Sequence, residues 1–332
     1  MSDDRITLAL AQAGGLPVSG RIAVLRPPAG ADLAALPRDR ALIVTPFRPD
    51  QDRWQAAGWQ VARAPEGSFA AAVLFLPRAR ALARALVHQI AGLVPPGAPV
   101  LVDGQKTDGI DAALRDLRGR ADILASVSKA HGRAFLFANP GPAAFAGWEG
   151  AAHQVAPGFV TRPGVFSADG IDPGSALLAA HLPHSLQGTG ADLGAGWGWL
   201  AAQILSRPAV RELHLVEADA DALDCARDNI SDPRAQFHWA DATTFGVARS
   251  VDFVAMNPPF HQGRAADPSL GAAFILAAGR LLRPHGQLWM VANRTLPYEQ
   301  VLAGAFASVQ TVADDRGFKI IHAARPHASR RA

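Results

Sequence analysis

The sequence predicts an α/β protein made of two tandem, doubly wound domains. The chain has 332 residues, whereas single hydrophobic cores stop growing at about 250–300 residues. Apolar strand-like runs alternate with helical stretches along the chain, which is the pattern of parallel strands joined by crossover helices. Apolar residues make up 49% and charged residues 18%, a balance that indicates folded domains and argues against a disordered chain.

The second half contains six strand candidates, most of them separated by helical stretches such as WLAAQIL (199–205) and ALDCARDNI (222–230). The latter contains the single cysteine, Cys225, which we interpret as a packing residue. One cysteine excludes an intramolecular disulfide and fits a reducing compartment. The strand candidates are GADLG (190–194), ELHLVEA (212–218), QFHWA (236–240), VDFVAMN (251–257), QLWMVAN (287–293) and FKIIHAA (318–324).

The first half repeats the order and spacing of the second, which favours an internal duplication. The matching pairs are AAVLFLP (71–77) with VDFVAMNPP (251–259), the helical stretches 79–97 and 271–286, PVLVDGQKTDGID (99–111) with QLWMVANRTLPYEQ (287–300), and SKAHGRAFLFANP (128–140) with DDRGFKIIHAARP (314–326).

The two copies differ where chemistry is expected, because LPRAR (76–80) stands where the second half has NPPFHQG (257–263). We therefore expect a domain of residues 1–150 that serves structure or substrate binding, and a catalytic domain of residues 151–332. The Gly-, Ala- and Pro-rich segment 139–154 is the expected linker.

Composition constrains the location and the partners of the protein. The N-terminus lacks the basic start and apolar stretch of a signal peptide, and no run of about 18 apolar residues occurs. We therefore expect a cytoplasmic protein with no membrane contact. A net charge of +3 permits a polyanionic partner without requiring one. No metal site is expected, and a monomer is favoured.

A glycine-rich turn, DLGAGWG (192–198), joins a predicted strand to a helix. Its spacing is G-x-G-x-G and not the G-x-G-x-x-G of dinucleotide sites, which disfavours an oxidoreductase. The acidic Asp192 precedes the glycines and suits the ammonium group of S-adenosylmethionine (SAM), a ligand without a pyrophosphate. The predicted cofactor residues in this turn are Asp192, Gly194, Ala195, Gly196 and Gly198.

Acidic residues also follow the next two predicted strands. Glu217 is placed to accept hydrogen bonds from both ribose hydroxyls of SAM. Asp241 is a candidate for the adenine amino group, with the backbone around Ala242 supplying further adenine contacts. The alternative for each of these acids alone is a solvated strand end or a helix cap, and the cofactor role is favoured because they occur together with the glycine turn.

The motif Asn257-Pro258-Pro259-Phe260 follows the strand VDFVAM and is the sharpest signal in the chain. An amine bonded to a conjugated ring is a poor nucleophile, because its lone pair is delocalised. The Asn257 side-chain oxygen and the Pro258 carbonyl are two acceptors that favour a more nucleophilic nitrogen. The prolines stiffen the loop, and Phe260 is a candidate for stacking on a base. We expect these four residues to be catalytic.

With these motifs in place, the chain resembles the bacterial ribosomal RNA guanine-N2 methyltransferases of the small-subunit type. The shared segments are PGVFSADGIDPGS (163–175), DLGAGWG, NPPFHQG, VANRTLPY (291–298) and GFKIIHA (317–323). The resemblance covers nearly the whole chain. It implies two Rossmann-like class I methyltransferase domains, the N-terminal one degenerate, with SAM as cofactor and ribosomal RNA or a ribosomal subunit as partner.

The same resemblance assigns segment 163–175 to closure of the SAM pocket, with Phe166 and Ser167 as candidate contacts. The family often has cysteine within the glycine turn where this chain has Ala195, a change between small residues. Trp197 is bulkier than usual in that position, and we expect it to narrow the pocket mouth.

Several basic groups are candidates for phosphate contacts, although such residues are more often a solvated face. Lys319 is a further candidate at the edge of the cofactor domain. A single-stranded or flipped base is expected, since base pairing hides N2 inside a duplex. The groups are Arg78, Arg80 and Arg84; Arg115, Arg118 and Arg120; Lys129 and Arg133; and Arg325, Arg330 and Arg331.

The motif alone leaves other planar amines open: guanine N2 of the large-subunit RNA, adenine N6, and the glutamine amide of release factors. A release-factor enzyme is expected to carry a small helical N-terminal domain, whereas the first half here resembles a second α/β unit. A SAM-binding RNA-interaction module without activity is the non-enzymatic alternative, and the intact motif argues against it.

Overall fold

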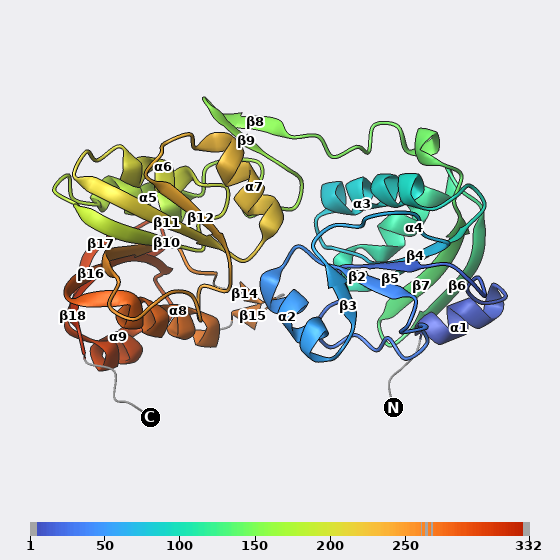
Figure 1. Cartoon of the computed structure of the whole chain (residues 1–332), viewed down its shortest axis with the longest axis horizontal. Helices are drawn as coiled ribbons and strands as arrows, with labels where there is room; N and C mark the ends of the chain where they lie inside the picture. The colour runs from blue at the N-terminus through green and yellow to red at the C-terminus, as the bar shows by residue number, and fades with distance from the viewer. Residues whose placement is uncertain (1–4, 260, 263–264, 267, 328–332) are drawn as a thin grey trace. The chain divides into compact units, whose positions relative to one another are not determined.

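The computed structural model describes residues 5–259, 261–262, 265–266 and 268–327. The chain divides into two compact units, Met1–Ala152 and His153–Ala332. Figure 1 draws the first in blue to green and the second in green to red. Each unit is built on a seven-stranded sheet with helices, so the predicted α/β fold class is confirmed. No helix among the described residues has the length and apolar character needed to cross a membrane.

The sheet of the first unit has the order β3-β2-β1-β4-β5-β7-β6. Its strands are parallel except for β7 and β6, which are antiparallel to their neighbours. The strands are β1 (Ile22–Leu25), β2 (Ala41–Val44), β3 (Gln60–Ala62), β4 (Ala71–Phe75), β5 (Pro99–Gln105), β6 (Ile123–Lys129) and β7 (Gly132–Ala138).

Apolar cores lie on both faces of this sheet, which explains why β1, β2 and β4 are buried along their whole length. One core includes Leu86 and Ile90 of α3 and Leu114 of α4, and the other includes Ile6 of α1 and Trp54 of α2. The helices are α1 (Arg5–Gln12), α2 (Arg48–Ala56), α3 (Arg80–Leu93) and α4 (Ile110–Arg118), with 3₁₀ turns η1 (Lys106–Asp108) and η2 (Pro142–Phe145).

The second unit starts with a hairpin, β8 (His153–Ala156) and β9 (Phe159–Thr161), and continues into a sheet of order β12-β11-β10-β13-β16-β18-β17. The strands are β10 (Gly188–Leu193), β11 (Val210–Glu217), β12 (Ala235–Trp239), β13 (Val251–Met256), β16 (Leu282–Asn293), β17 (Phe306–Asp315) and β18 (Phe318–Pro326), with a short pair β14 (His261–Gln262) and β15 (Ala265–Ala266). The helices are α5 (Pro173–His181), α6 (Trp199–Leu205), α7 (Ala220–Asn229), α8 (Pro268–Leu281) and α9 (Glu299–Ala305).

The two sheets have the same strand order, rank by rank, and each ends in an antiparallel pair. The sequence pairs noted above occupy equivalent places, since β4 matches β13, β5 matches β16 and β7 matches β18. This agreement of topology supports the predicted duplication of one α/β unit.

The topology of the second unit brings the carboxyl ends of five parallel strands, β10 to β13 and β16, to one edge of the sheet. β10 lies between β11 and β13, with Asp192 opposite Leu215 on one side and Ala255 on the other. The chain runs from β10 outward through β11 to β12 and then returns to β13 on the other side of β10, so the strand order reverses here. Such a switch point is where open α/β sheets bind ligands. The chain segments that follow these strands are therefore expected to form a site.

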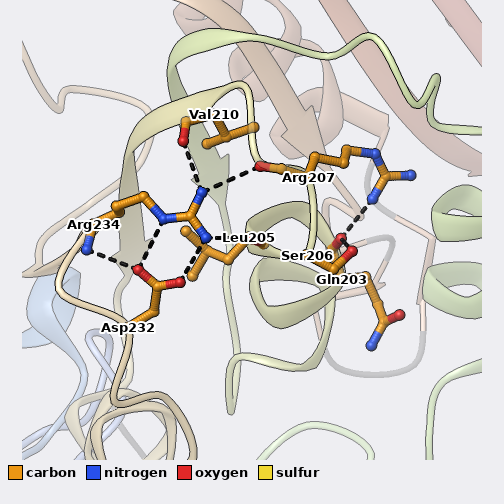
Figure 2. A network of polar contacts seen from close by, with 7 residues as sticks. All are labelled: Gln203, Leu205, Ser206, Arg207, Val210, Asp232 and Arg234. Atoms are coloured by element: carbon orange, nitrogen blue, oxygen red, sulfur yellow. Dashed lines mark hydrogen bonds and ion pairs between the residues drawn. The ribbon is translucent and has the colours of Figure 1, made fainter.

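Two arginines, Arg207 and Arg234, connect the C-terminal end of α6 to the segments around it (Figure 2). Arg234 binds Asp232 and donates to the carbonyls of Leu205 at 2.5 Å and Val210 at 2.8 Å. Arg207 donates to the carbonyls of Pro183 and Gln203. The last carbonyls of a helix have no partner within the helix, so these contacts satisfy the end of α6 and fix it against the sheet.

Candidate active site

The glycine turn after β10 has a backbone that residues with side chains rarely adopt. The φ angles of Gly194, Gly196 and Gly198 are +78°, +55° and +89°. The amides of Gly194 and Ala195 donate to the carbonyl of Val216, which pins the turn to the end of β11. The turn then opens directly into α6, whose first amides point back toward it.

Gly198 faces α7 and does not line the pocket described below. A Cβ at this position would lie 2.8 Å from Ile230 Cδ1 and 3.1 Å from Ala226 Cβ. The third glycine therefore permits close packing of α6 against α7, and its predicted contact with the cofactor stays a prediction.

Buried Asp192 and half-buried Glu217 form an acidic pair beside the turn. Asp192 is 1% exposed, and its Oδ2 has no hydrogen-bond partner among the described residues. Burial, together with the nearby Glu217 carboxylate, raises the pKa of Asp192 to about 8. Burial also raises the pKa of Glu217 to about 7, although amides of Asp219 and Gly196 donate to it at 2.8 Å and oppose the rise. A positively charged ligand beside these two carboxyls would favour their ionised forms and offset the cost of their burial.

Asn257 lies immediately after β13, at the same edge of the sheet. Its Nδ2 donates to Asp172 Oδ2 at 2.7 Å and to Ser175 Oγ at 2.9 Å. None of the described residues donates to Asn257 Oδ1, so this oxygen remains available as an acceptor. Pro258 is buried and Pro259 is exposed. Phe260 lies outside the described residues.

An open pocket brings most of these residues together. It joins the glycine turn, Asn257 and the segment before α5, which are far apart in the sequence. Its walls are Phe166, Ser167, Asp172, Ser175, Asp192, Gly194, Ala195, Gly196, Trp197, Trp199, Leu200 and Asn257.

Phe166 and Ser167 lie at the rim of this pocket. The Phe166 side chain is 61% exposed, while its carbonyl accepts a hydrogen bond from Trp197 Nε1 at 3.1 Å. Ser167 has φ +53° and donates from Oγ to the Gly170 carbonyl at 2.7 Å. Trp197 is 4% exposed and packs edge-on against Phe159. Its bulk therefore fills the core beneath the rim and anchors the Phe166 backbone.

Asp241 and Ala242 follow β12 at the same edge but do not line the pocket. Asp241 Oδ1 accepts from the Thr243 amide at 2.8 Å and from its hydroxyl at 2.7 Å. Ala242 is 4% exposed and belongs to the apolar core. Their predicted contacts with adenine stay predictions.

Sequence reasoning did not assign Asp172, Ser175, Trp199 or Leu200 to the site. The first two lie within the segment 163–175 that was singled out by resemblance, but no local pattern links them to Asn257. Trp199 and Leu200 are the first residues of α6, so the position of the glycine turn alone was a signal that they face the pocket.

The sequence-family model of the methyltransferase small domain matches residues 157–322, which contain every residue that lines this pocket. A ribosomal RNA small subunit methyltransferase C of Idiomarina loihiensis is 30% identical over 92% of this chain and 94% of its own length. The enzyme of the same name from Stutzerimonas stutzeri is 34% identical over 79% of this chain and 81% of its own.

The chain belongs to the ribosomal RNA small subunit methyltransferase C family. It is therefore a SAM-dependent methyltransferase, as the glycine turn and the Asn-Pro-Pro motif predict. A solved structure, the T. thermophilus 16S rRNA N2 methyltransferase (RsmC) in complex with AdoMet and guanosine, has the same fold with a TM-score of 0.78. It is 23% identical and covers 98% of this chain and 92% of its own.

The basic groups of this family member are partly engaged within the protein. Arg80 and Arg84 both bind Asp116 at 2.9 Å, and the guanidinium groups of Arg84 and Arg120 lie 5.1 and 4.9 Å from the centre of the Trp148 ring. Arg330 and Arg331 lie outside the described residues. Contact of these groups with RNA remains a prediction.

The expectation that Lys319 contacts nucleic acid is wrong. Lys319 is 6% exposed, donates to the Leu296 carbonyl at 2.9 Å and pairs with Glu299. A buried, paired ammonium group has no access to a phosphate. Its position in β18 instead fastens the loop that follows β16. Cys225 is fully buried, which confirms its interpretation as a packing residue.

Proposed function

We propose that the protein transfers a methyl group from SAM to the exocyclic N2 amine of a guanine in 16S ribosomal RNA. The observation that carries this proposal is the orientation of Asn257, whose nitrogen is held by two acceptors and whose oxygen is left for a donor. The family supplies the class of substrate. The related T. thermophilus structure, solved with AdoMet and guanosine, supports guanine N2 over the other planar amines.

The acidic pair fits the cationic methyl donor. Asp192 is buried with one oxygen unpartnered among the described residues, and a positive charge beside it would offset its burial. We assign Asp192 to the ammonium group, Glu217 to the ribose hydroxyls, and Asp241 with the Ala242 backbone to the adenine. When bound, SAM supplies a sulfonium methyl group that is a strong electrophile.

Asn257 and Pro258 act on the amine. Asn257 Oδ1 and the Pro258 carbonyl accept hydrogen bonds from its two N–H groups, which draws the lone pair of the nitrogen out of conjugation. Bound SAM would supply its methyl group to this nitrogen and leave as the thioether S-adenosylhomocysteine, and the methylated nitrogen would release one proton to water. Preorganised acceptors and in-line placement then provide the rate enhancement.

The two units have different roles in this proposal. The first unit has Leu76-Pro77-Arg78 after β4, the place that Asn257-Pro258-Pro259 take after β13. Leucine has no side-chain oxygen to accept a hydrogen bond from an N–H group. We therefore assign catalysis to residues 151–332 and structure or RNA binding to residues 1–150. We further propose that the protein acts as a monomer in the cytoplasm, on ribosomal RNA or the small subunit.

Incubation with labelled SAM tests the substrate. Purified small subunits, large subunits, stripped RNA and release factor are offered separately, and the labelled product is digested and mapped by mass spectrometry. We expect label in N2-methylguanosine from the small-subunit RNA. Label in N6-methyladenosine, in a glutamine residue or in the large-subunit RNA alone contradicts the proposal.

A further inference from the structure

The amide of Asn257 is held by a carboxylate that the transfer chemistry itself does not use. Asp172 Oδ2 accepts from Asn257 Nδ2 at 2.7 Å and from the Ser175 amide at 2.7 Å. Ser175 Oγ accepts from Asn257 Nδ2 at 2.9 Å. Each of the two N–H groups of the Asn257 amide thus has an acceptor, although Asp172 and Asn257 are 85 residues apart in the sequence.

The local sequence Asp172-Pro173-Gly174-Ser175 accounts for this arrangement. Asp172 is the N-cap of α5 and Pro173 occupies the first turn, where its missing N–H is not needed. Glycine is unfavourable inside a helix, but a Cβ at Gly174 would lie 3.0 Å from Asp172 Oδ2 and 3.3 Å from the Phe318 ring. The absent side chain therefore leaves room for the carboxylate to reach both Ser175 and Asn257.

We propose that Asp172 and Ser175 are positioning residues that fix the Asn257 amide with its oxygen toward the target amine. The two orientations of an asparagine amide have nearly the same shape and differ in which atom faces the substrate. A flipped amide would present N–H groups to the N–H groups of guanine and turn Oδ1 toward the Asp172 carboxylate. A carboxylate has no hydrogen to donate, so the flipped amide would lose its hydrogen bond to Asp172 as well as its hydrogen bond from guanine. This inference rests on the proposed function.

The same contact also strengthens the acceptor. A hydrogen bond from an amide N–H to a carboxylate is charge-assisted, and hydrogen-bonded groups polarise one another. Donation from Nδ2 to Asp172 increases the negative charge on Asn257 Oδ1. The oxygen that faces guanine N2 is then both correctly placed and a better acceptor.

Substitution of Asp172 by serine separates positioning from helix capping. Serine is as good an N-cap as aspartate, so Asp172→Ser keeps α5 capped, but its shorter and uncharged side chain does not hold Asn257. We expect kcat to fall by about 10- to 100-fold, because small misplacements of reacting groups have effects of that size. The SAM Kd and the Tm should stay close to those of the wild type. A kcat within twofold of the wild type overturns the inference.

An exchange of the two side chains provides a rescue test that a purely structural role would not pass. Asn257→Asp places two carboxylates against each other and should lose most activity. Adding Asp172→Asn restores a donor and acceptor pair of reversed polarity, with a carboxylate oxygen toward the amine. We expect the double variant to recover at least about 10-fold in kcat over Asn257→Asp alone, since the restored pair fixes the acceptor again. No recovery contradicts the inference.

The side-chain amide protons of Asn257 give a readout that does not depend on the substrate. In ¹⁵N-labelled protein, the Asn257→Asp spectrum identifies these resonances by their loss. The proton that faces Asp172 should be deshielded in the wild type and should shift upfield in Asp172→Ser. Unchanged shifts overturn the inference. A wild type that transfers no methyl to guanine refutes the proposed function instead, and the amide resonances still decide whether Asp172 holds Asn257.

Discussion

Replacement of Asp192 by asparagine should change how the stability of the SAM-free protein depends on pH. Burial and the nearby Glu217 raise the pKa of Asp192 to about 8 from the ordinary value of 3.8. Between these values the folded state binds the proton more tightly than the unfolded state, so the free energy of unfolding falls as pH rises. An amide in place of the carboxyl does not titrate and removes this fall.

The magnitude follows from the size of the shift. A displacement of about four units, at 1.36 kcal/mol per unit, gives an upper limit of about 5–6 kcal/mol at pH 9. The effective dielectric of buried sites is far above that of a dry interior, so a measured difference on the order of 2 kcal/mol is expected. This corresponds to a shift of roughly 4–8 °C in the Tm of a unit of this size.

Calorimetric melting from pH 5 to pH 9 measures the effect as the difference in slope between variant and wild type. Any fixed packing cost of the new amide cancels in the slope. Asp252→Asn is a matched control whose slope should equal that of the wild type between pH 5 and pH 9. Although burial opposes the change, hydrogen bonds from the Thr189 amide and Arg283 lower the pKa of Asp252, so its stabilisation is lost only as the pH falls below the ordinary value of 3.8. Equal slopes for Asp192→Asn and the wild type would refute the reasoning.

Three further outcomes are expected. SAM affinity should rise by up to about 10-fold per pH unit between pH 7 and pH 8 and level off above pH 8, because binding requires the Asp192 carboxyl to be ionised. Below pH 7 the dependence should steepen, because the Glu217 carboxyl also has to lose its proton. Calorimetry in buffers of different ionisation enthalpy should show proton release, and a flat profile contradicts this. Asn257→Ala should lower turnover about 100-fold or more with a SAM Kd within threefold, measured by single-turnover transfer, and intact turnover contradicts its role. Gly198→Ala should destabilise the second unit by about 2 kcal/mol or more, as measured by urea unfolding. The φ angle of Gly198 is +89°, and Ile230 occupies the space that the new Cβ needs. An unchanged unfolding midpoint contradicts the packing role.

The sequence predicted those parts of the molecule that local patterns control. The strands that end at Leu193, Glu217 and Met256 were predicted from short apolar runs, and the structure has strands there. The glycine turn was visible because its spacing reflects a backbone that only glycine adopts readily. The first three strands of the first unit were not identified, because each has only three or four residues and no flanking motif.

Contacts between distant segments were beyond sequence reasoning. Nothing local in Asp172-Pro173-Gly174-Ser175 indicates that its carboxylate reaches Asn257, and the sequence reads equally well as an ordinary helix start. The sequence shows the charge of Lys319 but not its burial against Leu296, and the prediction of a nucleic-acid contact fails for that reason. A residue type alone does not report whether a charge is solvated or paired.

A crystal structure with an unreactive SAM analogue and guanosine tests the central claim most directly. We expect guanine N2 at about 3 Å from both Asn257 Oδ1 and the Pro258 carbonyl, with the Asn257 amide nitrogen still on Asp172. A guanine bound with N2 away from Asn257, or an amide whose nitrogen faces the base, would contradict the account.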